Sequence, residues 1–371
     1  MTAAPTAAPT QDRENPMNPD AARRPTHDAT RDPRPARRLR RLALPTSVAV
    51  VVGLAATACS TPVPRATPEA TVTQPALSID QDTAILGKVG DVLTVADKKR
   101  DSKALSQRLS GPALAMRTAE LKVAKSAKSD DDLTALPTKV QTVVVPTSTD
   151  WPRAAFAVSA QPSETEPPRL MALEQGTARD NYTLWGWARL FPGITMPTFA
   201  APGTGSSAVT SDDSSLVLTP KSAVAHYVDV LNKGTKSKYA KSFAEDPFRT
   251  GLASKATALD KNKDFKSAKG KYGETFTPAK SDPLATRTAD GGALVMVDAS
   301  AVEKTSAESK AKIAPSTDAT KALFGDTTPT NTLVVTYRDV FALYVPPVGA
   351  SDTKVTVLGV EHVPVTVRTH S

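Results

Sequence analysis

The chain has 371 residues, with 46 Lys and Arg against 38 Asp and Glu, one cysteine and four histidines. A single cysteine excludes a disulfide within the chain, and so few thiol and imidazole groups leave too few ligands for a dedicated zinc site. Residues 1–58 contain nine Lys and Arg and five Asp and Glu, so this segment carries half of the net charge of +8 and no nucleic-acid partner is expected.

The N-terminal segment, residues 1–58, has the three-part layout of a secretory signal. Residues 1–36 are rich in Pro, Thr, Ala and charge and are expected to be disordered, with Met17 as an alternative start. Four arginines in residues 37–41 then precede the 17 mostly apolar residues 42–58. A spanning helix needs roughly 20 apolar residues, so the segment predicts a cleaved signal peptide. The arginines leave the rest of the chain on the extracytoplasmic side of the membrane.

Cys59 lies at the expected cleavage point. This stretch resembles the lipobox of bacterial lipoproteins, in which a small residue precedes an invariant cysteine that is acylated and becomes the new N-terminus. Ala56 departs from that pattern, because Leu, Val or Ile usually stands three residues before the cysteine. The small residues 56–58 also suit ordinary cleavage, which would release a secreted protein. A lone thiol has no partner within the chain, so lipidation of Cys59 and anchoring to the cell membrane are preferred over free secretion.

Residues 59–77 are rich in Pro and Thr and predict an extended tether, whose threonines are candidates for glycosylation. A first α+β domain is expected over residues 78–199. A capping box at Ser78 begins a helix, and further helices are expected near Leu105 and from Ser110 to about Lys128. Strands are predicted at Lys139–Val145, Arg153–Ala160, Arg169–Glu174 and Tyr182–Leu190.

Residues 200–217 are rich in Gly, Ser and Asp and predict a linker, which a second α+β domain follows at residues 218–371. Thr219-Pro220 has the order of an N-cap followed by a first-turn proline, and a further helix is expected from Asp246-Pro247 to about Lys263. Strands are predicted at Lys271–Thr277, Ala285–Thr288, Ala293–Ala299, Thr332–Val345 and Lys354–Val367, with a hairpin turn at residues 289–292.

The two halves repeat the order of helices followed by strands. Shifting the first half by 135 residues superimposes Val89, Val92, Leu93, Ala96 and Pro112 on Val224, Tyr227, Val228, Leu231 and Pro247. This repeat indicates two tandem α+β domains, each with about three helices packed on a curved antiparallel sheet. Each half resembles the cystatin-like or nuclear-transport-factor-2-like cone.

The pattern Trp151-Pro152-Arg153 and Tyr182-x-Leu184-Trp185-x-Trp187-x-Arg189-Leu190, together with the signal, tether and tandem halves, resembles a family of actinobacterial secreted lipoproteins of unknown function. The resemblance covers about residues 75–371 and rests on layout more than on diagnostic motifs. It implies a location and a fold, and it implies no activity.

Two tryptophans and an arginine form the most informative local pattern in the first half. On a strand, Trp185, Trp187 and Arg189 point to one face. Two indoles beside a guanidinium suit a sugar or an anionic ligand through stacking and cation–π contacts. Aromatic stripes are more commonly core, which favours the interpretation that the tryptophans pack beneath the helices. In a cone the space between sheet and helices also admits ligands, so both interpretations stay open.

In the second half, Asp339 shares one strand face with aromatic residues. A carboxyl in such surroundings has a raised pKa and can act as a general base, as in some isomerases of the cone fold. The alternative, that Asp339 pairs with a Lys or Arg at the strand end, is favoured because such pairs are common. His226 and His362 are interpreted as edge residues rather than as a catalytic pair. The Lys-rich stretch 255–271 suits an anionic polymer, although a solvated helix face is the commoner explanation.

No nucleophile motif, metal motif or phosphate loop occurs in the right context, so no catalytic residue, metal or cofactor is assigned. The sequence predicts a lipid-anchored envelope protein that binds or scaffolds an envelope protein, a lipid or a glycan and meets the membrane through Cys59. The alternative is an envelope hydrolase or isomerase that uses a pocket carboxylate. Two convergent carboxylates in a cavity would favour the enzyme, whereas a groove lined by Trp185 and Trp187 would favour binding. A purely structural spacer would instead have filled domains and an exposed apolar patch.

Overall fold

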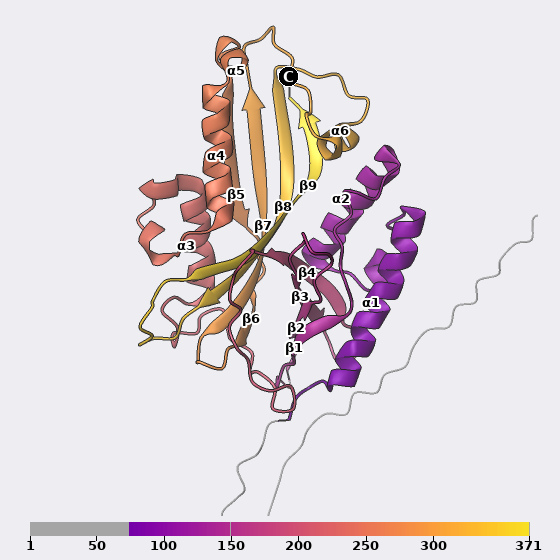
Figure 1. The fold of residues 1–371 in the computed structure, drawn as a ribbon, viewed down its shortest axis with the longest axis vertical. Coiled ribbons are helices and arrows are strands. Elements are labelled where there is room, and N and C mark those ends of the chain that lie inside the picture. Colours follow the sequence, from indigo (N-terminus) through magenta and orange to yellow (C-terminus); the bar gives the residue numbers. More distant parts are fainter. Residues whose placement is uncertain (1–73, 149, 371) are drawn as a thin grey trace, which may run out of the picture. The chain divides into compact units, whose positions relative to one another are not determined.

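The computed structural model describes residues 74–148 and 150–370 (Figure 1). Within them, six α-helices pack against a large antiparallel sheet, so the predicted α+β class is confirmed. The signal segment 1–58, Cys59 and most of the tether 59–77 lie outside the described residues.

Three helices begin at the capping residues that the sequence predicts. Ser78 caps the first helix, because its hydroxyl accepts a hydrogen bond from the Gln81 N–H (3.1 Å) while the Gln81 side chain accepts one from the Ser78 N–H (2.8 Å). Thr219 and Asp246 cap two later helices, each followed directly by a proline. The helices are α1 (Ile79–Lys99), α2 (Gly111–Ala127), α3 (Pro220–Lys233), α4 (Pro247–Lys261), α5 (Lys263–Ser267) and α6 (Asp318–Phe324), with 3-10 turns at η1 (Leu105–Gln107), η2 (Gly234–Lys236) and η3 (Ala240–Ser242).

All nine predicted strands are present. They are β1 (Val140–Val144), β2 (Arg153–Ser159), β3 (Arg169–Gln175), β4 (Thr183–Leu190), β5 (Lys271–Pro278), β6 (Leu284–Arg287), β7 (Ala293–Ser306), β8 (Thr332–Val345) and β9 (Thr356–Thr369). The main difference is in β7, which continues to Ser306 because it pairs with β8 along its full length. Neither α5 nor α6 was expected from the sequence.

The strands form one nine-stranded sheet in the order β1-β2-β3-β4-β9-β8-β7-β5, with β6 paired to β7. The link between the two predicted halves is the short contact between β4 and β9, where Arg189 lies opposite Val360 and Leu190 lies opposite Gly359. Gly359 permits this contact, because a Cβ atom at this position would collide with the backbone carbonyl of Arg189. The last strand of the chain thus joins the first four strands to the rest of the sheet.

Strand β8 supplies residues to two hydrophobic cores. Val340 and Ala342 belong to the core that α1, α2 and β2–β4 build, whereas the alternate residues Phe341 and Leu343 belong to the core beneath α3. Successive side chains of a strand point to opposite faces, so the two cores lie on the two sides of β8. The described residues, 74–148 and 150–370, lie within one compact unit, and the tandem division into two separate cone domains is not confirmed.

Candidate functional site

The two tryptophans of the predicted ligand-binding group are core residues. Trp187 is fully buried and Trp185 is 6% exposed, and both pack in the core shared by α1, α2 and β2–β4. Trp185 is the extra residue of a bulge in β4, because Leu184 pairs with Leu173 while the next paired residue is Gly186. The bulge interrupts the alternation expected for this strand. Of the group, only Arg189 has a substantially exposed side chain, at 48%.

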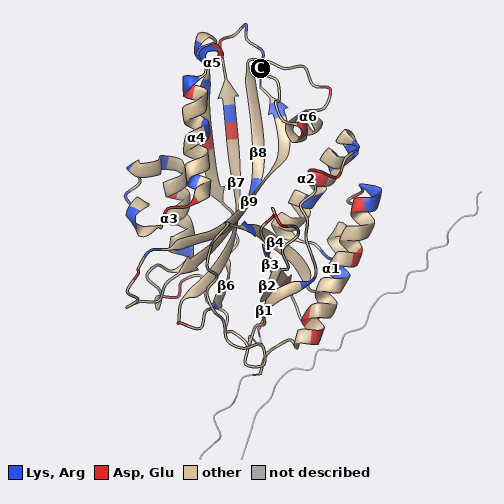
Figure 2. Ribbon diagram, in the orientation of Figure 1, with Lys and Arg blue, Asp and Glu red and all other residues tan. Residues whose placement is uncertain are grey.

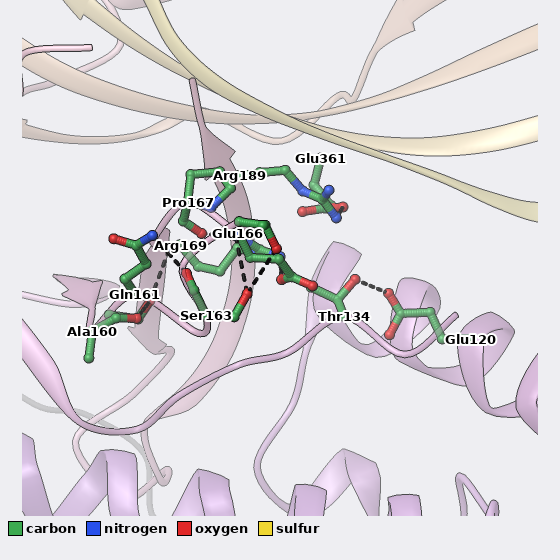
Figure 3. A network of polar contacts seen from close by, with 12 residues as sticks. Glu120, Thr134, Ala160, Gln161, Ser163, Glu166, Pro167, Arg169, Arg189 and Glu361 are labelled. Carbon is green, nitrogen blue, oxygen red and sulfur yellow. Dashed lines mark hydrogen bonds and ion pairs between the residues drawn. The ribbon is translucent and has the colours of Figure 1, made fainter. Parts of the chain in front are cut away.

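Arg189 lines a cavity of about 300 Å³ where β3, β4, β9, α2 and α6 meet. We call it the Glu361 pocket; its polar side is formed by Glu120, Thr134, Glu166, Arg169, Arg189 and Glu361. Figure 3 shows Arg189 and Glu361 lying side by side, with the Arg169 and Thr134 side chains nearby. The C-terminal part of α2 and helix α6 pack together on the ends of β8 and β9, which brings these distant segments to one place.

Glu361 is the most unusual group of the pocket. It lies on β9 opposite Val340, its side chain is 7% exposed, and its Oε2 atom makes no hydrogen bond. The Arg189 guanidinium lies 3.7 Å from Glu361 Oε1, which is long for an ion pair. Burial raises the pKa of the Glu361 carboxyl to about 7, against the opposing effect of Arg189. The indole N–H of Trp187 also lowers this pKa, but it completes no hydrogen bond of normal geometry.

The other charged groups of the pocket are held by partners. Arg169 is fully buried and donates from Nη2 to Glu166 (2.7 Å) and from Nη1 to the Pro167 carbonyl. Glu120 is buried beside Arg117, whose Nη1 atom lies 2.7 Å from it, and accepts a further hydrogen bond from the Thr134 hydroxyl at 2.6 Å. These pairs fix the loops at residues 130–134 and 160–168 around the pocket. They leave Glu361 as the buried carboxyl without a hydrogen-bonding partner there.

Asp339 lies on the face of β8 opposite to that of Val340, the residue that pairs with Glu361, although its neighbour His362 also lines the Glu361 pocket. Asp339 is fully buried, and its Oδ1 atom lies 2.5 Å from Nδ1 of His362, directly opposite on β9. Burial raises the pKa of Asp339, and the hydrogen bond with His362 opposes this shift. The His362 ring stacks on Tyr337 with centroids 3.9 Å apart, and its Nε2 atom lies 3.5 Å from Glu274. The partner of Asp339 is therefore a histidine rather than the Lys or Arg that the sequence favoured.

The second histidine considered from the sequence is not part of this pair. His226 lies on α3 and stacks on Tyr239, with ring centroids 3.6 Å apart. The Lys-rich stretch 255–271 lies on α4, α5 and the start of β5, where Figure 2 shows Lys and Arg positions. Lys255 pairs with Glu303 and Lys269 lies 3.9 Å from Glu308, and helix α4 has no fully buried residue. These are properties of a largely solvated helix.

Sequence reasoning missed Glu361, Glu120 and Arg169. A weak signal was present for Glu361, because it interrupts the apolar strand sequence Leu358-Gly359-Val360-Glu361 at a position that pairs with buried Val340. A charged residue at an inward strand position usually needs a partner or a function. The signal becomes visible only when the pairing of β8 and β9 is known.

Two further observations concern only the described ranges 74–148 and 150–370. No group of three or more His, Cys, Asp or Glu side chains there is placed to hold a metal ion. No helix in that part of the chain combines the length and the apolar character needed to cross a bilayer.

Comparison with known proteins supplies a family but no activity. The profile of a family described as "Domain of unknown function (DUF8094)" matches residues 73–367. An "Uncharacterized lipoprotein" of Streptomyces avermitilis is 27% identical over 290 residues, which cover 76% of this chain and 83% of that protein. No solved structure matches the chain significantly. The predicted resemblance to an actinobacterial lipoprotein family of unknown function is thereby confirmed.

Proposed function

The chain belongs to the DUF8094 family, and from this premise we propose that it is a lipid-anchored cell-envelope protein that binds a small ligand in the Glu361 pocket. The proposal has two parts, anchoring through Cys59 and binding through the pocket. Each part rests on separate observations and has its own test.

Anchoring is supported by the N-terminal sequence and by the relative. Arginines, an apolar segment and a cysteine occur in the order that lipoprotein signals require, and the similar Streptomyces protein carries the name lipoprotein. Acylation of Cys59 would leave residues 60–77 as a tether between the bilayer and the folded part. One acyl chain binds a membrane only marginally, so stable anchoring requires more than one chain or an added signal.

Binding is supported above all by Glu361. Buried carboxyl groups normally have hydrogen-bonding partners, because an unpaired buried charge is costly. Glu361 Oε2 has none, and it lies beside a cavity of about 300 Å³, at the lower end of the size of small-molecule sites. A ligand with positive charge that occupies the pocket would compensate the charge of this carboxyl.

Anchoring is tested by expressing the full chain and a Cys59→Ala variant in an actinobacterial host and fractionating the cells. We expect the wild-type protein in the membrane fraction, labelled by radioactive palmitate, and the variant unlabelled. Recovery of an unlabelled wild-type protein with residues 1–58 intact would contradict the anchoring part.

Binding is tested by native mass spectrometry of the full chain extracted from membranes in detergent. We expect a small molecule to remain bound to the wild-type protein and to be absent from Glu361→Gln. The matched control is Asp260→Asn, which removes an exposed carboxyl on α4, outside the pocket. Equal loading of all three proteins, or no bound molecule in any, would contradict binding in the Glu361 pocket.

One observation favours the alternative that the protein is an envelope enzyme. Glu120 and Glu361 line the same pocket, and Glu361 has a pKa near operating pH, as a general acid or base requires. Glu120 is already engaged by Arg117 and Thr134, so of these two carboxyls only Glu361 is free to react. If the protein is an enzyme, the molecule recovered from wild-type protein will be chemically converted on incubation, and Glu361→Gln will stop the conversion.

A further inference from the structure

We propose that the Glu361 pocket binds a primary ammonium group carried on a short aliphatic chain. This inference rests on the proposed binding function and specifies the chemistry of the ligand.

The charges of the pocket favour a cation. Five carboxyl groups, two guanidinium groups and His362, whose Nδ1 atom is engaged by Asp339, line it. The Arg169 guanidinium is engaged by Glu166, and the buried Glu120 is engaged by Arg117 from outside the lining. After these pairs are set aside, Glu361 and the rim residues 131 and 132, both aspartates, face the single guanidinium of Arg189. The remaining field attracts positive charge and disfavours an anion.

The geometry around Glu361 leaves room for a second cationic donor. Arg189 lies 3.7 Å from Oε1 and is 48% exposed, while Oε2 is buried without a hydrogen bond. Charge-assisted N–H to carboxylate bonds are normally about 2.7–2.9 Å long, so Arg189 does not satisfy this carboxyl. An ammonium group offers three donors on one compact charge and can bind the Oε1 side of the carboxylate, beside Arg189, more easily than a second planar guanidinium.

The rest of the pocket suits an alkyl chain rather than a bare ion. Its apolar wall consists of Val123, Leu133, Ala319, Val363 and Pro364. The cavity of about 300 Å³ is on the order of ten times the volume of a water molecule in the liquid. A ligand with one charged end and several methylene groups would fill both the polar and the apolar side.

The test is isothermal titration calorimetry of the full-length protein in non-ionic detergent with n-butylammonium chloride as the probe. Phosphate buffer at pH 8 is used because amine buffers would compete and because the Glu361 carboxyl, with a pKa of about 7, is mostly charged there. Sodium butyrate and n-butanol serve as probes of similar size with negative and no charge. We expect n-butylammonium to bind on the order of tenfold more tightly than either.

Two substitutions should change the affinity for n-butylammonium in opposite directions. Glu361→Gln removes the charge and should weaken n-butylammonium binding by roughly tenfold or more. Arg189→Gln removes the competing cation and should strengthen binding by about two- to fivefold. The matched control Asp260→Asn removes an exposed carboxyl on α4, outside the pocket, and should change the affinity by less than about threefold, because exposed charges are screened. Thermal unfolding of each variant establishes that it is folded, and Arg189→Gln remains informative if Glu361→Gln does not fold.

Several outcomes would overturn the inference. They are tighter binding of butyrate than of n-butylammonium, weaker ammonium binding by Arg189→Gln, or calcium binding at the same site that excludes the probe. If native mass spectrometry finds a Glu361-dependent ligand but n-butylammonium does not bind, the ammonium assignment fails while the binding function stands. If neither is observed, both fail.

Discussion

Asp339 on β8 and His362 on β9 lie directly opposite each other, and their Oδ1 and Nδ1 atoms are 2.5 Å apart. Aromatic side chains surround the pair, because His362 stacks on Tyr337 and its ring centroid lies 5.4 Å from that of Phe248 and 6.4 Å from that of Phe276. Asp339 is fully buried, so this hydrogen bond is made in a low-dielectric environment. We therefore expect the pair to contribute to stability.

Replacing Asp339 with alanine should lower the free energy of unfolding by about 2–3 kcal/mol, because His362 Nδ1 loses its partner in a partly buried site. Chemical denaturation monitored by circular dichroism measures the change. The control is Asp260→Ala on the exposed side of α4, which should change stability by less than about 0.5 kcal/mol. Equal effects of the two substitutions would show that the Asp339–His362 bond adds nothing to stability.

The contribution of Asp82 to the free energy of unfolding should be larger at pH 4 than at pH 8. It is fully buried on α1, neither carboxyl oxygen has a hydrogen bond, and burial raises its pKa from 3.8 to about 6. A carboxyl whose pKa is raised by folding contributes stability below pH 3.8, and this contribution is lost as the pH rises through about 6. Asp82→Asn stays neutral, so at pH 8 it should be more stable than wild type by up to about 3 kcal/mol.

The measurement for Asp82 is the difference in unfolding free energy between Asp82→Asn and wild type at pH 8 and at pH 4. The difference should be largest at pH 8 and nearly vanish at pH 4. A less stable Asp82→Asn protein at pH 8 would mean that the charged carboxylate is stabilised in the fold.

Gly359 should be intolerant of any side chain. A Cβ atom there collides with the backbone of Arg189 and Leu190, so Gly359→Ala must separate β4 from β9. We expect a loss of about 2–3 kcal/mol, in the range of overpacked cores. Gly87→Ala on α1 is the matched control, because no atom lies within 4 Å of its Cβ position and alanine favours the helix by about 0.5–1 kcal/mol. If Gly359→Ala and Gly87→Ala shift the melting temperature in the same direction, the close approach of β9 to β4 at Gly359 is contradicted.

The three tryptophans should differ in their access to solvent. Trp151 is 40% exposed, whereas Trp185 and Trp187 are buried in the core. Acrylamide should therefore quench the fluorescence of the wild-type protein partly and that of Trp151→Phe very little. Strong quenching in Trp151→Phe would place the other two indoles in an open groove, as the ligand-binding hypothesis for Trp185 and Trp187 requires.

Local signals in the sequence were sufficient to predict the nine strands and four of the six α-helices in the described residues. Ser78, Thr219 and Asp246 mark helix starts because a cap satisfies backbone groups only a few residues away. The nine strands follow from alternating apolar residues and the turns that bound them. Helix α6 was missed because it is only seven residues long, and its burial depends on α2 and β9 rather than on its own pattern.

The orientations and partners of the predicted site residues could not be derived from local sequence patterns alone. Alternation along a strand placed Trp185, Trp187 and Arg189 on one face, but a bulge at Trp185 disturbs that alternation. A bulge is decided by the register of β4 against β3, which no local signal reveals. The hydrogen-bonding partner of Asp339 likewise depended on which residue of β9 lies opposite it.

By itself, the amino-acid sequence determined which segments are helices and strands, the α+β class and the resemblance to a lipoprotein family, because these depend on residues close together along the chain. Only the tertiary structure decided that β9 pairs with both β4 and β8, making one sheet from the two halves. The same pairing buries Glu361 beside Arg189 and places Asp339 against His362. Strand pairing between distant segments is chosen by the packing of whole cores, so it leaves no signature in a short stretch of sequence.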